Sequence, residues 1–387
     1  MGRPLKIAIV VPDNRDEFRS YADLRPHFGA APTALMDGLA LLPECEVHVV
    51  CCVQRPLVAP EKIGPNIFYH TEIVPKWGWM RGGYLGCIRS IRRQLAEIRP
   101  DIVHGQGTER YCALSAAFSG FPNVVTIHGN MRAIAKLYDA RIGSFNWLAA
   151  RLETLALART AGVFCNSAYT ESLVRPRARK VWRVANALRP VFFEPANLVS
   201  PPVRPVILNI GVMEPRKQQV PLLRVARAWH QRRLDFDLRF VGNKCEQTAY
   251  GGEFSRALAQ AEADGYARHL GTLPAASLIA AMDQASALIH FPTEESFGLV
   301  VAEALARNLK FFGAAIGGIT DIASGVEGAE LFASGDWSSL QEQAGQWIQA
   351  GSPRPVSAAA AMKQRYHPLI IARQHLKIYQ EVLNTRL

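Results

Sequence analysis

The feature that most constrains the fold is a repeated alternation of short apolar runs with longer helical patterns. The apolar runs of the first half are 6–11, 47–53, 102–104, 124–128 and 162–166. The helical patterns between them are 33–42, 85–98 and 147–158. Continuous apolar strands that alternate with helices are typical of a parallel sheet covered on both faces. The first half therefore predicts a doubly wound α/β domain.

The alternation stops at a proline-rich stretch and then starts again. Residues 194–205 contain four prolines, which is typical of a domain linker. Strand-like runs follow at 206–211, 236–242, 287–292 and 310–314, and a last helical pattern covers 367–384. The expected organisation is a first domain at 1–193, a linker at 194–205, a second domain at 206–366, and a C-terminal helix at 367–387 that returns to the first domain. Ligands of such sheets bind beyond the carboxyl ends of the strands, so a site is expected between the domains.

The positive charge of the chain is concentrated in its first half. Residues 1–190 contain 25 Lys and Arg against 15 Asp and Glu, whereas residues 191–387 contain 19 against 18. The net charge of +11 therefore belongs almost entirely to the first half. Such asymmetry indicates that this half faces something anionic.

Composition excludes several other classes of protein. With 49% hydrophobic and 20% charged residues, the chain is expected to be globular. It has no apolar run of membrane-spanning length, and its first residues suit a buried strand better than a signal peptide. Its seven cysteines are scattered without a C-x-x-C pair, which disfavours structural zinc. We expect a cytoplasmic protein with reduced cysteines.

The segment P-T-E-E-S-F-G-L at 292–299 joins an apolar strand to an apolar helix. A glycine at the helix start, Gly298, would let a phosphate approach the free N–H groups and the positive end of the helix dipole. Glu295 would then lie beside the group attached to that phosphate. Glu303, inside the apolar helix, could accept hydrogen bonds from the two hydroxyls of a ribose. Two glutamates at this spacing arise often by chance, so the prediction depends on the surrounding strand, loop and helix.

Several segments together resemble a known family. They are 292–306 with 313–322, V-V-T-I-H-G at 124–129, F-C-N-S-A-Y-T at 164–170, 184–195, and I-G-V-M-E-P-R-K-Q at 210–218. In this order, and over nearly the whole chain, they resemble the retaining glycosyltransferases of family 4. That family has the GT-B fold, in which two Rossmann-like doubly wound domains face each other across a cleft.

The resemblance implies a role for each matching residue in the second domain. Lys217, together with Arg216, would neutralise the donor diphosphate. Glu303 would hold the ribose, and Glu295 would contact the donor sugar. The backbone amides of the helix start would bind phosphate and sugar oxygens, and they belong to Gly298, Leu299 and Val300.

Two matching positions lie in the first domain. His128 would reach the donor sugar, and Gly29 matches the first glycine of a Gly-Gly loop near the diphosphate. Ala30 replaces the second glycine of that loop. Val212 stands where many members have arginine, so either Arg216 takes over that charge or phosphate binding is weaker. Asn308 replaces a common glycine and is interpreted as a helix end.

The resemblance also implies an activity. We expect a retaining glycosyltransferase of the hexosyltransferase type that uses a UDP- or GDP-sugar. The acceptor would be a saccharide or a lipid-linked molecule, in the synthesis of surface polysaccharide or lipopolysaccharide. Neither a metal nor any cofactor beyond the donor is expected.

Other interpretations remain open at this point. The chain could bind a nucleotide-sugar without transferring it, or it could bind nucleic acid through its basic half, although no nucleic-acid motif accompanies the charge. The segment G-Q-G-T-E-R at 105–110 lacks the third glycine of a dinucleotide motif. His104 is expected to be a core residue.

The helical pattern at 85–98 is amphipathic, with arginines opposite an apolar face. It is expected to be a surface helix packed on its sheet, and the alternative is a helix that lies on a membrane. The basic segment 174–183 adds to the second interpretation. Peripheral contact with anionic lipid at the inner membrane face is therefore a hypothesis.

Overall fold

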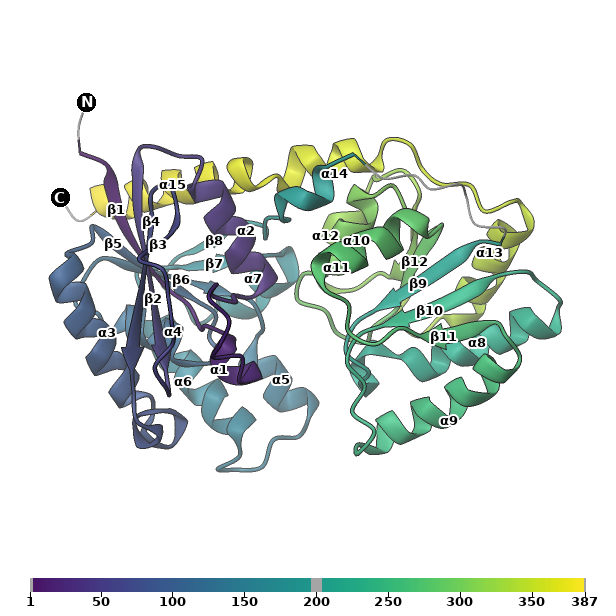
Figure 1. The fold of residues 1–387 in the computed structure, drawn as a ribbon, viewed down its shortest axis with the longest axis horizontal. Coiled ribbons are helices and arrows are strands. Elements are labelled where there is room, and N and C mark those ends of the chain that lie inside the picture. Colours follow the sequence, from purple (N-terminus) through teal and green to yellow (C-terminus); the bar gives the residue numbers. More distant parts are fainter. Residues whose placement is uncertain (1–2, 196–203, 386–387) are drawn as a thin grey trace. The chain divides into compact units, whose positions relative to one another are not determined.

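The computed structural model describes residues 3–195 and 204–385, so most of the predicted linker lies outside the described residues. The chain divides into two compact units. Unit 1 comprises the residues up to Arg189 together with those from Tyr366 onward, and unit 2 comprises Pro190–Arg365. Each unit is an α/β structure built on one sheet (Figure 1).

Unit 1 contains, among its described residues, an eight-stranded sheet in the order β3-β4-β2-β1-β5-β6-β7-β8. Its strands are β1 (Leu5–Val10), β2 (Cys45–Val53), β3 (Lys62–Gly64), β4 (Ile67–Ile73), β5 (Ile102–Gln106), β6 (Asn123–Ile127), β7 (Val163–Cys165) and β8 (Val181–Arg183). Every neighbouring pair is parallel except β3 with β4.

Helices cover both faces of this sheet. They are α1 (Arg15–Phe18), α2 (Ala30–Leu39), α3 (Leu85–Ile98), α4 (Tyr111–Ala117), α5 (Met131–Leu137), α6 (Phe145–Arg159), α7 (Ala168–Val174) and α15 (Pro368–Asn384), with the short 3-10 helices η1 (Lys76–Gly78) and η2 (Met80–Gly82). Successive residues of β1 point to opposite faces. Ile7 and Ile9 belong to a core with α2 and α15, whereas Ala8 and Val10 belong to a core with α3 and α4. The C-terminal helix α15 thus lies beside α2 on the sheet of unit 1 (Figure 1).

Unit 2 contains, among its described residues, a six-stranded sheet in the order β11-β10-β9-β12-β13-β14, and its neighbouring strands are parallel. Its strands are β9 (Val206–Ile210), β10 (Asp237–Val241), β11 (Ala267–His269), β12 (Ala287–His290), β13 (Lys310–Ala314) and β14 (Ala329–Phe332). Its helices are α8 (Gln219–Gln231), α9 (Ala249–Ala263), α10 (Ala275–Gln284), α11 (Leu299–Ala306), α12 (Gly317–Ala323), α13 (Trp337–Gln349) and α14 (Ala358–Tyr366), with η3 (Pro190–Phe193) and η4 (Pro215–Lys217).

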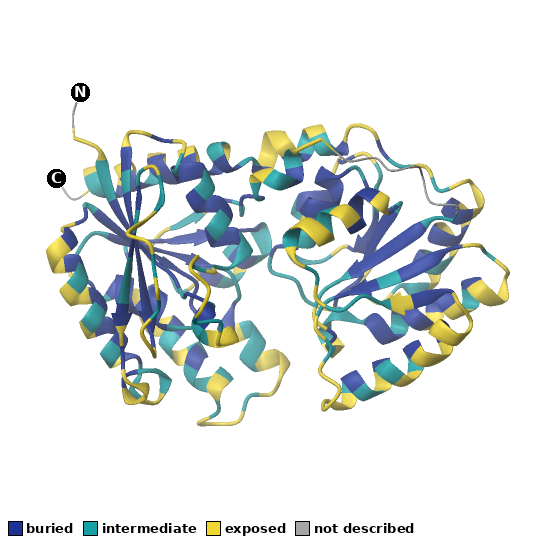
Figure 2. Cartoon of the chain, in the orientation of Figure 1, coloured by how far each residue is buried: buried dark blue, intermediate teal, exposed yellow. Residues whose placement is uncertain are grey.

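The predicted fold class of two doubly wound, Rossmann-like α/β domains is confirmed. The strands are the most buried parts of both units, and the outer faces of the helices are exposed (Figure 2). The start of unit 2 is fixed by Arg307, which pairs with Asp283 and donates to the carbonyl oxygens of Phe192 and Glu194. This contact attaches η3 to unit 2.

Residues 85–98 form a surface helix packed on its sheet, as expected. Ile88, Ile91, Leu95 and Ile98 of α3 are buried in the core against the sheet, so the apolar face of this helix is already covered. The basic segment 174–183 is also largely paired. Arg177 contacts Glu153, Lys180 contacts Glu381, and Arg175 and Arg183 both contact Glu171.

Two further expectations concern membranes and cysteines. Within residues 3–195 and 204–385, no helix has the length and apolar character needed to cross a membrane. All seven cysteines are free thiols, and Cys245 is the one that is exposed.

Candidate functional site

The loop between β12 and α11 forms the centre of the candidate site. β12 ends at His290, and α11 begins at Leu299 after an eight-residue loop that includes Gly298. Gly298 has a φ of 95°, a conformation that glycine adopts without steric cost. The N–H of Val301 donates to the carbonyl oxygen of Gly298 at 2.9 Å, whereas the N–H groups before it have no acceptor within the helix, so this end can bind an anion. Leu299 and Val300 are the first two residues of this turn.

Two glycines of α12 bring a second helix against this loop. The N–H of Gly318 donates to the carbonyl oxygen of Glu295 at 3.2 Å. A Cβ at Gly317 would lie 1.8 Å from that same oxygen, and one at Gly318 would lie 2.5 Å from the Cα of Phe297. Any other residue at either position would therefore push the loop away.

The side chains of Lys217 and His290 meet at Glu295. Lys217 Nζ lies 2.5 Å from Glu295 Oε2, and His290 Nε2 lies 3.1 Å from the same oxygen. Burial would raise the pKa of Glu295, but the hydrogen bond from His290 and the charge of Lys217 outweigh it and hold that pKa well below its usual range. Glu295 is therefore ionised at neutral pH.

His290 is 1% exposed, and burial, reinforced by the charge of Lys217, lowers its pKa. The neutral ring donates to Glu295 from Nε2, which leaves Nδ1 as an acceptor. Nδ1 has no hydrogen-bond partner among the residues that the structure describes. His290 was not predicted as a site residue, although its position directly before the loop could have indicated it.

Arg216 ties the β9–α8 loop to the β12–α11 loop. It donates to Glu214 Oε1 at 2.6 Å and to the carbonyl oxygen of Glu294 at 3.2 Å. Its own carbonyl accepts the N–H of Thr293 at 2.9 Å. Val212 stands where many members of the resembled family have arginine, and it is 52% exposed. The guanidinium of Arg216 therefore serves loop structure, and the neutralisation of a diphosphate predicted for it stays a prediction.

Glu303 lies on α11 and is only 7% exposed. A carboxylate is seldom buried this far without a partner. Its predicted contact with a ribose stays a prediction. Asn308 follows the end of α11 with a φ of 54°, so its interpretation as a helix end is confirmed.

The two predicted site residues of unit 1 lie at the carboxyl side of its sheet. His128 follows β6, and its Nε2 lies 3.0 Å from Gln106 Oε1. Burial lowers the pKa of His128 to about 4, so its ring is neutral at pH 7. Gly29 is the N-cap residue of α2, and Ala30 is the first residue of that helix. Unit 1 thus holds His128 and Gly29, whereas the other predicted residues belong to unit 2.

Two further residues accompany His128. Gln106 Nε2 contacts the ring of His104, which is fully buried against Tyr379 of α15, as expected for a core histidine. Glu109 Oε1 accepts the N–H of Gly129 at 2.7 Å, and burial raises the pKa of this carboxyl. Neither Gln106 nor Glu109 was predicted, because the segment 105–110 suggested only a weak dinucleotide motif.

The fold and the site define a class of protein. Two parallel-sheet, Rossmann-like α/β units are the arrangement of a GT-B glycosyltransferase. Residues 35–189 match the family model described as "Glycosyltransferase Family 4", and residues 192–365 match "Glycosyl transferases group 1". The chain belongs to this glycosyltransferase family.

Solved structures share the fold at low identity. The sucrose-phosphate synthase of Thermosynechococcus elongatus has a TM-score of 0.76 at 17% identity, over 98% of this chain and 100% of that one. HepE of Anabaena, in complex with UDP and glucose, has a TM-score of 0.70 at 16% identity, over 97% and 99%. The lipopolysaccharide outer core galactosyltransferase WaaB has a TM-score of 0.64 at 15% identity, over 99% and 100%. No curated protein matches the sequence significantly.

Proposed function

We propose that this chain is a retaining hexosyltransferase that moves a sugar from a nucleoside-diphosphate sugar to a saccharide or lipid-linked acceptor. The observation that carries the proposal is the meeting of Lys217, His290 and Glu295 in front of the N-terminus of α11. A cation and free backbone N–H groups at one place suit a diphosphate, and the adjoining carboxylate suits the hydroxyls of a sugar.

The reaction breaks the bond between the anomeric carbon and the β-phosphate oxygen, and the electron pair stays on that oxygen. Lys217 and the first turn of α11 stabilise the charge that develops there. The anomeric carbon gains oxocarbenium character, and the acceptor oxygen bonds to it and gives up its proton.

Retention requires either a covalent intermediate or attack from the face that the leaving group vacates. Glu295 is a poor nucleophile, because Lys217 and His290 hold the same carboxylate oxygen and its pKa is low. Attack from the vacated face is therefore the proposed course, with the departing phosphate oxygen as the nearest base for the proton.

The donor is proposed to be a UDP- or GDP-sugar. UDP-sugars are the preferred candidates because the structural neighbour HepE was solved with UDP-glucose. A role in surface-polysaccharide or lipopolysaccharide synthesis is supported by the similarity to WaaB. Independence from metal stays part of the proposal. We place the enzyme in the cytoplasm, where nucleotide-sugars are made, at the inner membrane face if its acceptor is lipid-linked.

The proposal is tested by incubating the protein with UDP- and GDP-hexoses and measuring nucleoside diphosphate release. The expected result is release from one donor at a rate that rises with a suitable acceptor, and a product whose anomeric configuration by NMR equals that of the donor. Inversion of configuration would overturn the proposed course. Nucleotide binding without release from any donor, with or without acceptor mixtures, would favour a binding protein that does not transfer.

A further inference from the structure

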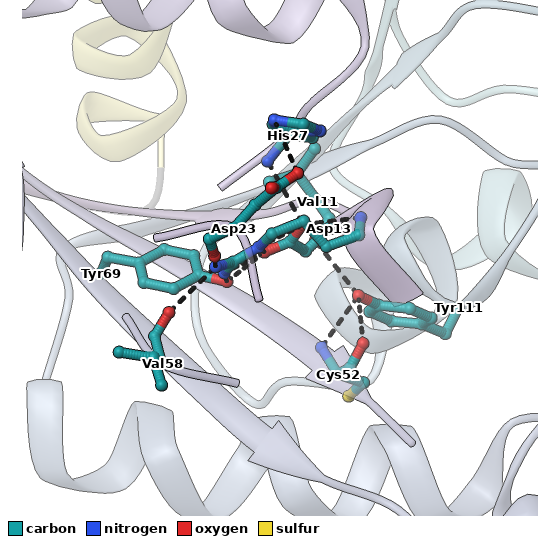
Figure 3. A network of polar contacts seen from close by, with 9 residues as sticks. Val11, Asp13, Asp23, His27, Cys52, Val58, Tyr69 and Tyr111 are labelled. Atoms are coloured by element: carbon teal, nitrogen blue, oxygen red, sulfur yellow. Dashed lines mark hydrogen bonds and ion pairs between the residues drawn. The ribbon is translucent and has the colours of Figure 1, made fainter. Parts of the chain in front are cut away.

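One buried polar network of unit 1 surrounds Arg15, which is fully buried with its guanidinium 2.6 Å from Asp13 Oδ2 (Figure 3). The same guanidinium donates to the carbonyl oxygen of Asp23 at 2.7 Å and to that of Val58 at 3.0 Å. The Tyr69 hydroxyl donates to Asp13 Oδ2 at 2.6 Å. The cation and the carboxylate therefore satisfy each other inside the protein, and this network serves the loops that it joins.

A second buried network of unit 1 ends instead at His128, a predicted site residue. His104 and Gln106 are two positions apart on β5, so their side chains lie on the same face of the sheet. His104 Nδ1 lies 2.6 Å from the hydroxyl of Tyr379 on α15. Gln106 Nε2 lies 3.2 Å from His104 Nε2, and Gln106 Oε1 lies 3.0 Å from His128 Nε2. A continuous run of polar contacts thus leads from α15 to His128.

The orientation of the Gln106 amide fixes which nitrogen of His128 carries the hydrogen. The amide nitrogen faces the His104 ring, and the amide oxygen faces His128. An amide oxygen can accept but not donate, so the hydrogen of this bond belongs to His128 Nε2. Because the ring of His128 is neutral at pH 7, its other nitrogen, Nδ1, carries a lone pair.

The surroundings of His128 suit a residue that meets a ligand. His128 follows the carboxyl end of β6 and is partly exposed, and ligands of parallel sheets bind beyond such strand ends. Gln106 is only 4% exposed, so it is placed to act on His128 and not on a ligand. Glu109 Oε1 accepts the N–H of Gly129 at 2.7 Å, so a second residue holds the backbone directly after His128.

We propose that Gln106 is a positioning residue: it keeps His128 in the Nε2–H tautomer, so that Nδ1 accepts a hydrogen bond from a hydroxyl of the sugar substrate. The other tautomer would present an N–H at that place and would reverse the direction of the bond. The inference rests on the proposed function, because it takes the ligand of His128 to be a sugar. Gln106 acts on the reaction through His128 alone.

The tautomer is measured by NMR on the full chain with labelled histidines, from the chemical shifts of the ring carbons and nitrogens. His128→Gln assigns the signals of His128 by their disappearance. We expect the Nε2–H tautomer in wild type at pH 7. Gln106→Met keeps the length of the side chain and removes the acceptor, so it should give a mixture of both tautomers. The Nδ1–H tautomer in wild type, or an unchanged tautomer in Gln106→Met, would overturn the proposal.

Kinetics with the best donor test whether Gln106 acts through His128. We expect Gln106→Met to lower kcat/KM about tenfold, because the Nε2–H of His128 loses its buried acceptor. In a His128→Ala background the same change should lower kcat/KM by about twofold at most. A residue that merely supports the fold would cost as much in both backgrounds, and that result would overturn the proposal.

Asn123→Leu is the matched control for these kinetics. It removes another buried amide, 5% exposed, at the opposite end of β6, where Asn123 donates to the carbonyl oxygen of Phe121. We expect this variant to lose stability but to keep kcat/KM. An equal loss of kcat/KM in Asn123→Leu and Gln106→Met would show that any buried amide of this sheet matters as much, and would overturn the specific role of Gln106.

A charged replacement keeps the test decisive if Gln106→Met does not fold. Gln106→Glu retains an oxygen at His128 Nε2 but adds a carboxylate, which favours the protonated ring and raises the pKa of His128 from about 4. The acid limb of kcat/KM should therefore move to higher pH by about one pH unit or more. His104, His375 and Glu109 also lie near His128, but wild type and variant share them. Identical pH profiles would overturn the proposal.

Nucleotide binding on the same samples separates this inference from the proposed function. UDP or GDP should bind Gln106→Met as tightly as wild type, because Lys217 and Glu303, which are predicted to bind the nucleotide, belong to unit 2. Transfer by wild type with a fully active Gln106→Met would overturn the role of Gln106 alone. No transfer from any donor by a wild type that holds the Nε2–H tautomer would overturn the transferase proposal instead.

Discussion

At the scale of the residue, the site depends on the contacts that Lys217 and His290 both make with the carboxylate of Glu295. A single oxygen of Glu295, Oε2, contacts both Lys217 and His290. Lysine has three N–H donors, so Lys217 can hold Glu295 and still donate to a phosphate. Glu295 and Lys217 could be predicted from their motifs, but not their contact, because they lie 78 positions apart in the sequence. His290 belongs to none of the recognised motifs, so its contact with Glu295 became visible only in the folded structure.

Replacing Lys217 should show how far this residue stabilises the negative charge that develops on the leaving group. We expect Lys217→Met to lower kcat by about 10² to 10³, the usual effect of removing one donor from a developing anion. Steady-state kinetics on the best donor would measure this. Lys244→Met, at another partly buried lysine of unit 2 that pairs with Glu246, is the control and should keep kcat. A Lys217→Met enzyme with wild-type kcat would refute this role.

A single added carbon at Gly317 should disturb the Glu295 loop. Because a Cβ there would lie 1.8 Å from the Glu295 carbonyl oxygen, Gly317→Ala should weaken nucleotide binding at least tenfold. Gly325 also has a positive φ, of 69°, but no atom lies within 4 Å of an added Cβ. Gly325→Ala should therefore lose only about 1 kcal/mol of stability and keep its nucleotide affinity. Equal affinities in the two variants, by titration calorimetry, would contradict this account of α12.

At the scale of the element, the strands with continuous apolar runs could be predicted and the others could not. β4 alternates buried and partly exposed residues near the sheet edge, and β3 and β8 have only three residues each. Their place is set by pairing with neighbours, which a local pattern does not contain. The same holds for the partners of α15, whose His375 stacks on Phe164 with ring centres 4.6 Å apart.

The buried His375 of α15 should make stability depend on pH. Burial lowers the pKa of His375 to about 4, so between about pH 6.5 and pH 4 the unfolded chain binds a proton that the folded chain does not. Stability should therefore fall as the pH falls through this window, by at most roughly 3 kcal/mol for this group. Urea unfolding at several pH values would measure the slope.

His375→Phe isolates this histidine from the others. It keeps a ring against Phe164 and loses the titrating group, so its stability should change less between pH 6.5 and pH 4 than that of wild type. A variant with the same slope as wild type would show that His375 does not titrate as its burial implies.

At the scale of the whole molecule, the repeat of the strand–helix pattern was enough to predict two α/β units. The attachment of η3 to unit 2 was not predictable, because it depends on the buried pair of Arg307 and Asp283 and not on the prolines. The charge asymmetry was visible in the sequence, but the pairing of most cations in 174–183 was not.

The central claim, a nucleoside-diphosphate site at the start of α11, is tested most directly by thermal unfolding with saturating UDP, GDP, ADP and CMP. The proteins compared are wild type, Glu303→Gln and, as a control, Glu253→Gln on α9. A nucleotide at a hundred times its Kd adds about 2.7 kcal/mol to the folded state. The account predicts that one diphosphate raises the Tm of wild type and of Glu253→Gln, and raises that of Glu303→Gln much less. No shift with any of the four nucleotides, or an equal shift in all three proteins, would contradict it.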